Sequence, residues 1–172
     1  MKRVLIIIMA LLFALPLSAG VYNDVSFSLG LDQYDFKNGI SASFGVNVGL
    51  SSRLELDLWT VSELIDIPFS ENIFGAELCY SLIGKRSTGS IVAGSGINTI
   101  VGAGVFYNTA SRGFGPILSI TPICVGSPIT GKRERIFRTG LGWDVANSEV
   151  LVTFSLVNID IYARGTYRDY EY

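Results

Sequence analysis

Three carboxylates are the side chains of this sequence best suited to chemistry. Glu55 and Asp57 lie two positions apart, and Glu77 follows one predicted strand later. Because alternate residues of a strand share a face, all three are predicted to point to the same side of neighbouring strands. Paired carboxylates could transfer protons, or attract cations into a narrow conduit. Arg138 and Arg164 are predicted on that side too, so a structural ion-pair network is the stronger interpretation, because buried charges need partners.

Other kinds of catalytic site find little support. The 172 residues contain no histidine, which excludes serine–histidine and other histidine-assisted mechanisms and histidine metal sites. The stretch from Gly126 to Arg133 nearly fits the phosphate-binding loop G-x-x-x-x-G-K-[ST], but arginine replaces the hydroxyl residue and no helix is predicted to follow. We therefore expect no catalytic, cofactor-binding or metal-binding residues, and no enzyme.

The two cysteines are too few for a disulfide scaffold, although an exported protein could form one bridge. Cys79 is predicted to point inward. Cys124 is predicted on the outward face that carries Leu118, Ile120 and Pro122. We therefore expect two unpaired thiols that behave as small apolar residues.

The elements that must position these groups are β-strands. From Val25 to Leu31 and from Ile40 to Leu50, every second residue is apolar, and the residues between them are mostly serine, glycine and asparagine. A period of two is typical of strands, and no helical period is found after residue 20. The pattern predicts about eight strands, at residues 25–32, 40–50, 54–61, 74–82, 93–105, 114–125, 137–145 and 150–167.

Two strands are expected to be irregular. Pro116 and Pro122 fall within the sixth, and because proline cannot donate to the strand ladder, this strand should be broken or distorted. In the last strand, the apolar residues change from even to odd positions near Val157. A β-bulge at this point would bring both halves onto one face.

The first twenty residues are predicted to be a cleaved signal peptide. Lys2 and Arg3 precede an apolar run that is too short to span a membrane, and three small residues end at Gly20. The mature domain, residues 21–172, would then carry 13 − 2 = 11 basic against 15 acidic residues, or about −4. This balance argues against nucleic acid as a partner, because phosphate binding needs clustered positive charge.

The residues on the polar face favour a barrel in a membrane over a soluble one. They are mostly serine and glycine, which suit a narrow lumen, whereas a surface in water favours lysine, glutamate and arginine. The opposite face is leucine, isoleucine, valine and phenylalanine, as expected beside lipid. Trp59 and Trp143 are expected in an interfacial aromatic girdle, and basic residues are expected in the two turns after the fourth and sixth strands: Lys85, Arg86, Lys132, Arg133 and Arg135.

With its export signal, alternating strands and final aromatic residues Tyr170 and Tyr172, the chain resembles the small bacterial outer-membrane barrels of the OmpA, OmpX and OmpW kind. The resemblance implies an all-β, up-and-down antiparallel transmembrane barrel in the outer membrane. It also implies contact with outer-membrane lipid, and recognition by the barrel-assembly machinery during biogenesis.

The expected function is structural, or porin-like passive permeation of small solutes. A second hypothesis is a surface interaction or adhesion protein acting through the loop from Ser62 to Asn72, which is unusually apolar. Its apolar residues are Leu64, Ile65, Ile67 and Phe69. A soluble exported barrel that binds a ligand is the third.

Overall fold

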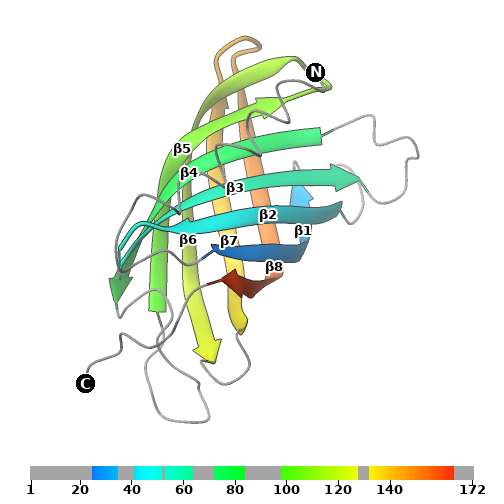
Figure 1. Cartoon of the computed structure of the whole chain (residues 1–172). Helices are drawn as coiled ribbons and strands as arrows, with labels where there is room; N and C mark the ends of the chain where they lie inside the picture. Colours follow the sequence, from blue (N-terminus) through cyan, green and yellow to red (C-terminus); the bar gives the residue numbers. More distant parts are fainter. Residues whose placement is uncertain are drawn as a thin grey trace.

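A computed structural model of the chain describes residues 25–34, 41–51, 53–63, 72–83, 98–127 and 132–164. These residues form eight β-strands that close into one barrel (Figure 1). The strands are β1 (Val25–Tyr34), β2 (Ser41–Gly49), β3 (Leu54–Glu63), β4 (Asn72–Ile83), β5 (Asn98–Asn108), β6 (Gly113–Ser127), β7 (Lys132–Asp144) and β8 (Glu149–Arg164).

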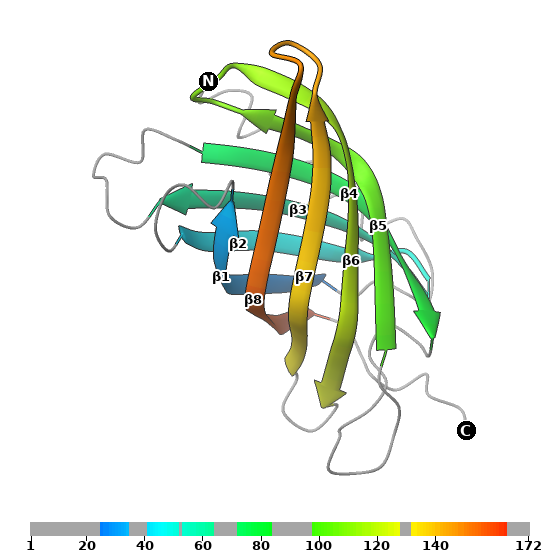
Figure 2. The same cartoon turned by 180° about the vertical axis from the view of Figure 1, so that it is seen from behind.

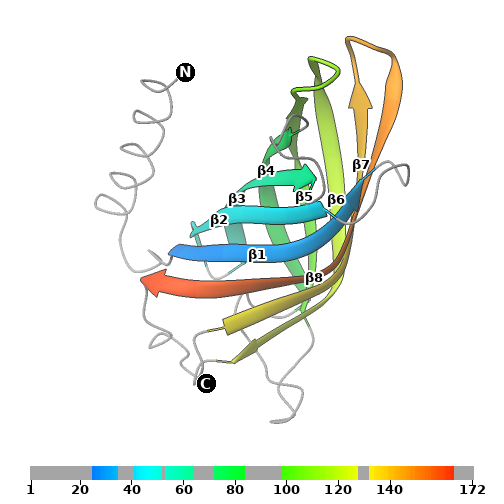
Figure 3. The same cartoon turned by 90° about the vertical axis from the view of Figure 1, so that its right-hand side faces the viewer.

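Each strand pairs antiparallel with its neighbour in the sequence, and β1 closes the barrel against β8. The views from behind and from the side show the sheet curling round on itself, with β1 alongside β8 (Figures 2 and 3). The predicted all-β, up-and-down antiparallel barrel is therefore confirmed. No helix within the described ranges has the length and apolar character needed to cross a membrane.

Several predictions fall outside the described residues. These are the signal peptide at 1–20, the apolar loop residues Leu64, Ile65, Ile67 and Phe69, the basic residues Lys85 and Arg86, and the C-terminal Tyr170 and Tyr172. Arg164 pairs through its backbone with Val25 at the seam between β8 and β1. Its side chain lies outside the described part of the structure.

Side chains alternate between the interior and the exterior as predicted along most strands. On β3, Glu55, Asp57 and Trp59 are buried in the lumen, while the leucines between them are on the outer face. Large apolar side chains cover the outside of the barrel, and many of them are about half exposed, such as Phe27 at 49% and Leu78 at 48%. The barrel is thus apolar outside and largely polar inside.

In three neighbouring strands, the alternation of inward and outward side chains reverses at the same level of the barrel. We call this level the bulge row. In it Ile123 of β6 pairs with Ile136 of β7, which pairs with Val157 of β8. In β8 one extra residue intervenes, because Leu31 and Asp32 of β1 pair with residues 157 and 155. This confirms the bulge predicted near residue 157. In β7 the next residue after Ile136 has a positive φ of 60°.

The bulge row overturns the predicted orientation of Cys124. Asn98 and Ile100 of β5 pair with Cys124 and Thr121 of β6, so β6 contains one extra residue at this point. Pro122 lies within this irregularity, as its inability to donate to the ladder predicts. Beyond it the alternation is reversed, and Cys124 is 1% exposed and packs inward with Cys79.

Candidate functional site

The lumen is the candidate functional site, because it collects nearly all the buried charged side chains of the described residues. We call the end of the barrel with the β5–β6 and β7–β8 turns the hairpin end, and the end where β1 begins and β8 finishes the terminal end. Charged side chains fill the half of the lumen toward the terminal end. Their order along each strand arranges them in successive layers.

The layer nearest the terminal end is organised by Arg133 of β7. Its guanidinium contacts Glu55 on β3, with Nη1 to Oε2 at 2.8 Å, and Asp160 on the neighbouring β8, with Nε to Oδ2 at 2.7 Å. Arg133 is completely buried, as are both carboxylates. The contact with Glu55 crosses the lumen, since β3 and β7 are not neighbours in the sheet.

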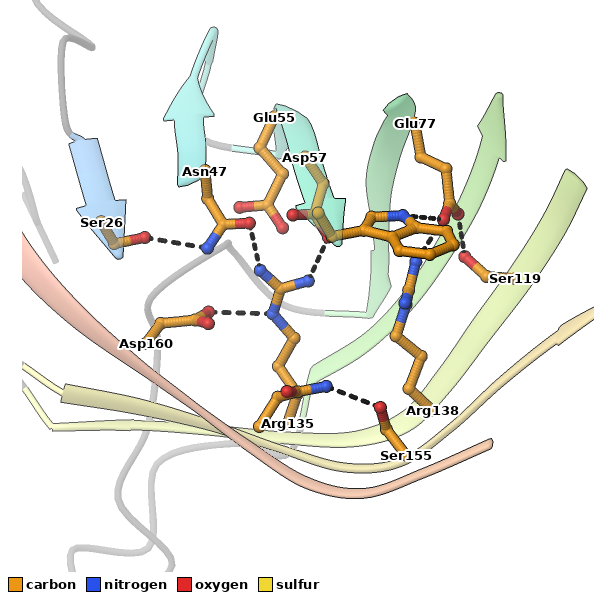
Figure 4. Close-up of polar contacts among 12 residues, drawn as sticks. Ser26, Asn47, Glu55, Asp57, Glu77, Ser119, Arg135, Arg138, Ser155 and Asp160 are labelled. Atoms are coloured by element: carbon orange, nitrogen blue, oxygen red, sulfur yellow. Dashed lines mark hydrogen bonds and ion pairs between the residues drawn. The ribbon is translucent and has the colours of Figure 1, made fainter. Parts of the chain in front are cut away.

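Arg135 makes the second layer, two residues further along β7 (Figure 4). It donates from Nη1 to Asp57 Oδ2 at 2.6 Å and from Nε to Asp160 Oδ2 at 2.8 Å. Its Nη2 donates to Asn47 of β2, whose own amide donates to Ser26 of β1 at 3.2 Å. This guanidinium thereby connects β7 with β8, β3 and β2, and through Asn47 with β1. It can do so because arginine presents several donors in one plane, and its charge makes these hydrogen bonds stronger than neutral ones.

The third layer is centred on Glu77 of β4. This carboxylate accepts hydrogen bonds from Trp59 Nε1 at 2.6 Å, from the Ser119 hydroxyl and from Arg138 Nη2 (Figure 4). The guanidinium of Arg138 also lies over the Trp59 ring, 5.1 Å from its centroid, in a cation–π contact. Gly75 leaves room for that ring, because a Cβ added at this position would overlap it.

Toward the hairpin end the lumen becomes apolar. Trp59 borders the ion pairs on one side and an apolar cluster on the other, which we call the apolar layer. Each of its members is at most 7% exposed: Trp59, Val61, Ile73, Phe106, Ile117 and Leu151. The lumen thus holds a charged plug followed by an apolar one.

A cavity of about 10 Å³ lies between the second and third layers, among Asp57, Trp59, Arg135, Arg138 and the inward residues of β1, β2 and β8. A volume of this size accommodates about one water molecule. The geometry therefore favours a structural network over a catalytic pair, since each of these carboxylates contacts a guanidinium. Within the described ranges, no group of three or more potential metal ligands is arranged to hold a metal ion.

The structure brings together four of the five residues that the sequence places in this network, namely Glu55, Asp57, Glu77 and Arg138. It differs from the sequence prediction for three others. Arg133 and Arg135, expected in a solvated basic turn, are inside the barrel at 0% and 3% exposure. Trp59, expected in an outer girdle, is in the lumen.

Sequence reasoning missed Arg133 and Arg135 because the predicted seventh strand began only at Phe137. The period-two spacing of the two arginines was the available signal. Asp160 was missed although a signal was available, because it has the same parity as Arg164, which was predicted inward, and lies beyond the bulge near Val157, where even-numbered residues turn inward.

A closed eight-stranded antiparallel barrel with an ion-paired interior and an apolar exterior is the class of protein that this fold and site define. Its fold is shared by the N-terminal β-barrel domain of Pseudomonas aeruginosa OprF, which aligns with a TM-score of 0.55. The alignment covers 82% of this chain and 98% of that domain, at 12% sequence identity. No protein-family model matches the sequence, and no curated protein matches it either.

Proposed function

We propose that this protein is an integral outer-membrane barrel with a closed lumen, and that its role is structural rather than that of a conduit. The observation that carries the proposal is the inverted polarity of the barrel. Arg133, which is 0% exposed, lies inside, while Leu118 on the outer face is 65% exposed. A barrel in water would gain by the opposite arrangement, whereas lipid favours apolar side chains on a fully hydrogen-bonded backbone.

The dimensions of the outer surface support a membrane location. On β4 the outward residues from Phe74 to Leu82 are all apolar or aromatic. Eight steps of about 3.3 Å along a strand tilted by about 40° give a height of roughly 20 Å, close to the ~25 Å apolar band of membrane barrels.

An aromatic row supports the same location and marks one edge of this band. Near the hairpin end, Tyr107 of β5 pairs with Phe74 of β4 on one side and with Phe114 of β6 on the other. All three side chains are exposed. Trp143 of β7 is also 47% exposed near this end. Tyrosine and tryptophan, which have an apolar and a polar part, favour the boundary between lipid and water, and aromatic girdles flank the apolar band of membrane barrels.

The filling of the lumen favours a structural role over porin-like permeation. A solute would have to pass both the ion-paired layers and the apolar layer, and only about 10 Å³ of cavity lies among the residues around Asp57. Hydrated ions need a wider and more polar path. The network ties β3 to β7 across the lumen, which holds opposite walls of the barrel together.

Fractionation tests the membrane location. The protein is expected to remain in the outer-membrane fraction after carbonate and high-salt washes, and to migrate differently on gels before and after heating. Complete extraction by either wash would contradict the proposal and favour the soluble ligand-binding barrel.

Planar-bilayer recordings test the closed lumen. Protein whose insertion is verified by heat-dependent gel migration is expected to produce no unitary opening events. The variant Trp59→Ala/Phe106→Ala, which thins the apolar layer, is the matched sample for a partly opened lumen. Regular conductance steps from the unmodified protein would overturn the structural role and support small-solute permeation.

A further inference from the structure

One residue that lines the cavity in the charged half of the lumen, Asp57, has an unusual carboxylate oxygen. Asp57 is 2% exposed, and its Oδ2 accepts the hydrogen bond from Arg135. Its Oδ1 is buried and has no hydrogen-bond partner among the described residues. Leaving a buried charged acceptor unpaired is costly, more so than for a neutral group.

The other residues that line this cavity can provide the partners that a small polar ligand needs. Ser28 on β1 and Ser43 on β2 line it with Asp57, and so do Arg135 and Arg138. A hydroxyl both donates and accepts, and a guanidinium only donates. The residues that line the cavity therefore carry both acceptors and donors around one small space.

We propose that this cavity is a binding site for a single structural water molecule that donates one hydrogen bond to Asp57 Oδ1. The volume of about 10 Å³ is close to the minimum for one water, and the two to four polar partners that a buried water requires are present. The water gives its second hydrogen to a serine oxygen and accepts a hydrogen bond from a guanidinium.

Water fits the site better than either kind of small ion. A cation would face the two guanidinium groups of Arg135 and Arg138, and an anion would face the Asp57 carboxylate. Like charges in direct contact repel strongly among side chains that are almost completely buried, as Asp57, Arg135 and Arg138 are. A neutral ligand that can both donate and accept is compatible with all of these neighbours.

The consequence is that two ion-pair layers become one network. Arg135 with Asp57 and Arg138 with Glu77 are separate clusters by their direct contacts. A water between Asp57 and Arg138 would connect them, and would add Ser28 of β1 and Ser43 of β2 to the connection. This inference depends on the lumen alone and stands whether or not the barrel is in a membrane.

A high-resolution crystal structure of the full-length protein tests the site, with crystals grown in rubidium bromide so that either ion gives an anomalous signal. We expect one density peak without anomalous signal, within hydrogen-bond distance of Asp57 Oδ1 and at least two of the other lining groups. No peak there, or an anomalous peak for rubidium or bromide, would overturn the proposal.

Two variants of Ser28 add a matched comparison. Ser28→Ala removes one partner but keeps the space, so the peak should persist. Ser28→Val fills the space, so the peak should disappear. In detergent solution, water-to-protein NMR cross-peaks at this position should be present for Ser28→Ala and absent for Ser28→Val. Equal cross-peaks in both would count against a water in this cavity.

Discussion

Removing the charge of Arg135 should destabilise the barrel more than any change on its outer surface. In Arg135→Met the stem of the side chain is retained, but Asp57 loses its hydrogen bond of 2.6 Å and Asp160 one of its two arginines. Arg135 is the cation that Asp57 contacts directly among the described residues, so Asp57 then becomes a buried carboxylate without a direct ion pair. Breaking a buried ion pair in this way costs about 3–5 kcal/mol.

The same strand provides the control. Glu134 is adjacent to Arg135 in the sequence but points outward and is exposed. Substitution at exposed sites usually changes the free energy of unfolding by no more than about 0.5 kcal/mol, so Glu134→Gln should behave like the unmodified protein. Urea unfolding of the refolded protein in lipid vesicles, followed by tryptophan fluorescence and heat-dependent gel migration, measures both variants.

A double variant isolates the role of the charge. If the loss in Arg135→Met comes from the unpaired carboxylate, adding Asp57→Asn should restore part of it, with a coupling energy of about 0.5–3 kcal/mol. A loss below about 1 kcal/mol in Arg135→Met, or an equal loss in Glu134→Gln, would refute the reasoning. So would strictly additive losses in the double variant.

Three further predictions concern other parts of the barrel. Gly104→Ala should prevent formation of the compact, heat-sensitive gel species, because the new Cβ would overlap a backbone oxygen of β4. Cys79 and Cys124 should remain reduced and react with a maleimide reagent only after unfolding. They lie on strands that are separated by β5, and two such strands are about 9.6 Å apart. This spacing exceeds the ~4.4–6.8 Å between the Cα atoms of a disulfide. Hydrogen bonds, first from the Asn147 side chain, lower the pKa of Asp144, so they stabilise the barrel while this carboxylate is charged. Asn147→Ala should therefore have a lower thermal midpoint than the unmodified protein at pH values above the usual pKa of 3.8, and this difference should shrink as the pH falls below it.

The sequence predicted the strands well because each half of a strand obeys a strict alternation. Buried Ser26 and exposed Phe27 are where their positions in the pattern place them. The alternation also set Glu55, Asp57 and Glu77 on one side, since no bulge interrupts the pairing of β3 with β4. The alternation of inward and outward side chains depends only on neighbouring residues of one strand, so it can be seen in a single sequence.

What the sequence did not supply for β6 and β7 is the relation between the parts of a strand on either side of a bulge. Arg135 and Arg138 are three positions apart, so alternation alone would place them on opposite faces. Both are buried in the lumen because the bulge row reverses the phase between them, and the reversal is shared by β6 and β8. Bulges depend on pairing across strands. The change of apolar parity revealed the bulge in β8, but the spacing within β6 and β7 revealed none there.

The ion-pair layers and the apolar layer of the lumen should contribute to different properties, the first to the free energy of unfolding and the second to the barrier against conduction. The ion pairs join distant walls such as β3 and β7, so their loss should be measured mainly as a lower free energy of unfolding. The apolar layer toward the hairpin end contains no ion pair, and water gains little by entering it. A variant such as Arg135→Met should therefore unfold at lower urea and still remain silent in a bilayer. If it conducted, the charged layer would be the main barrier, and the lumen would be better described as a conduit closed by its ion pairs.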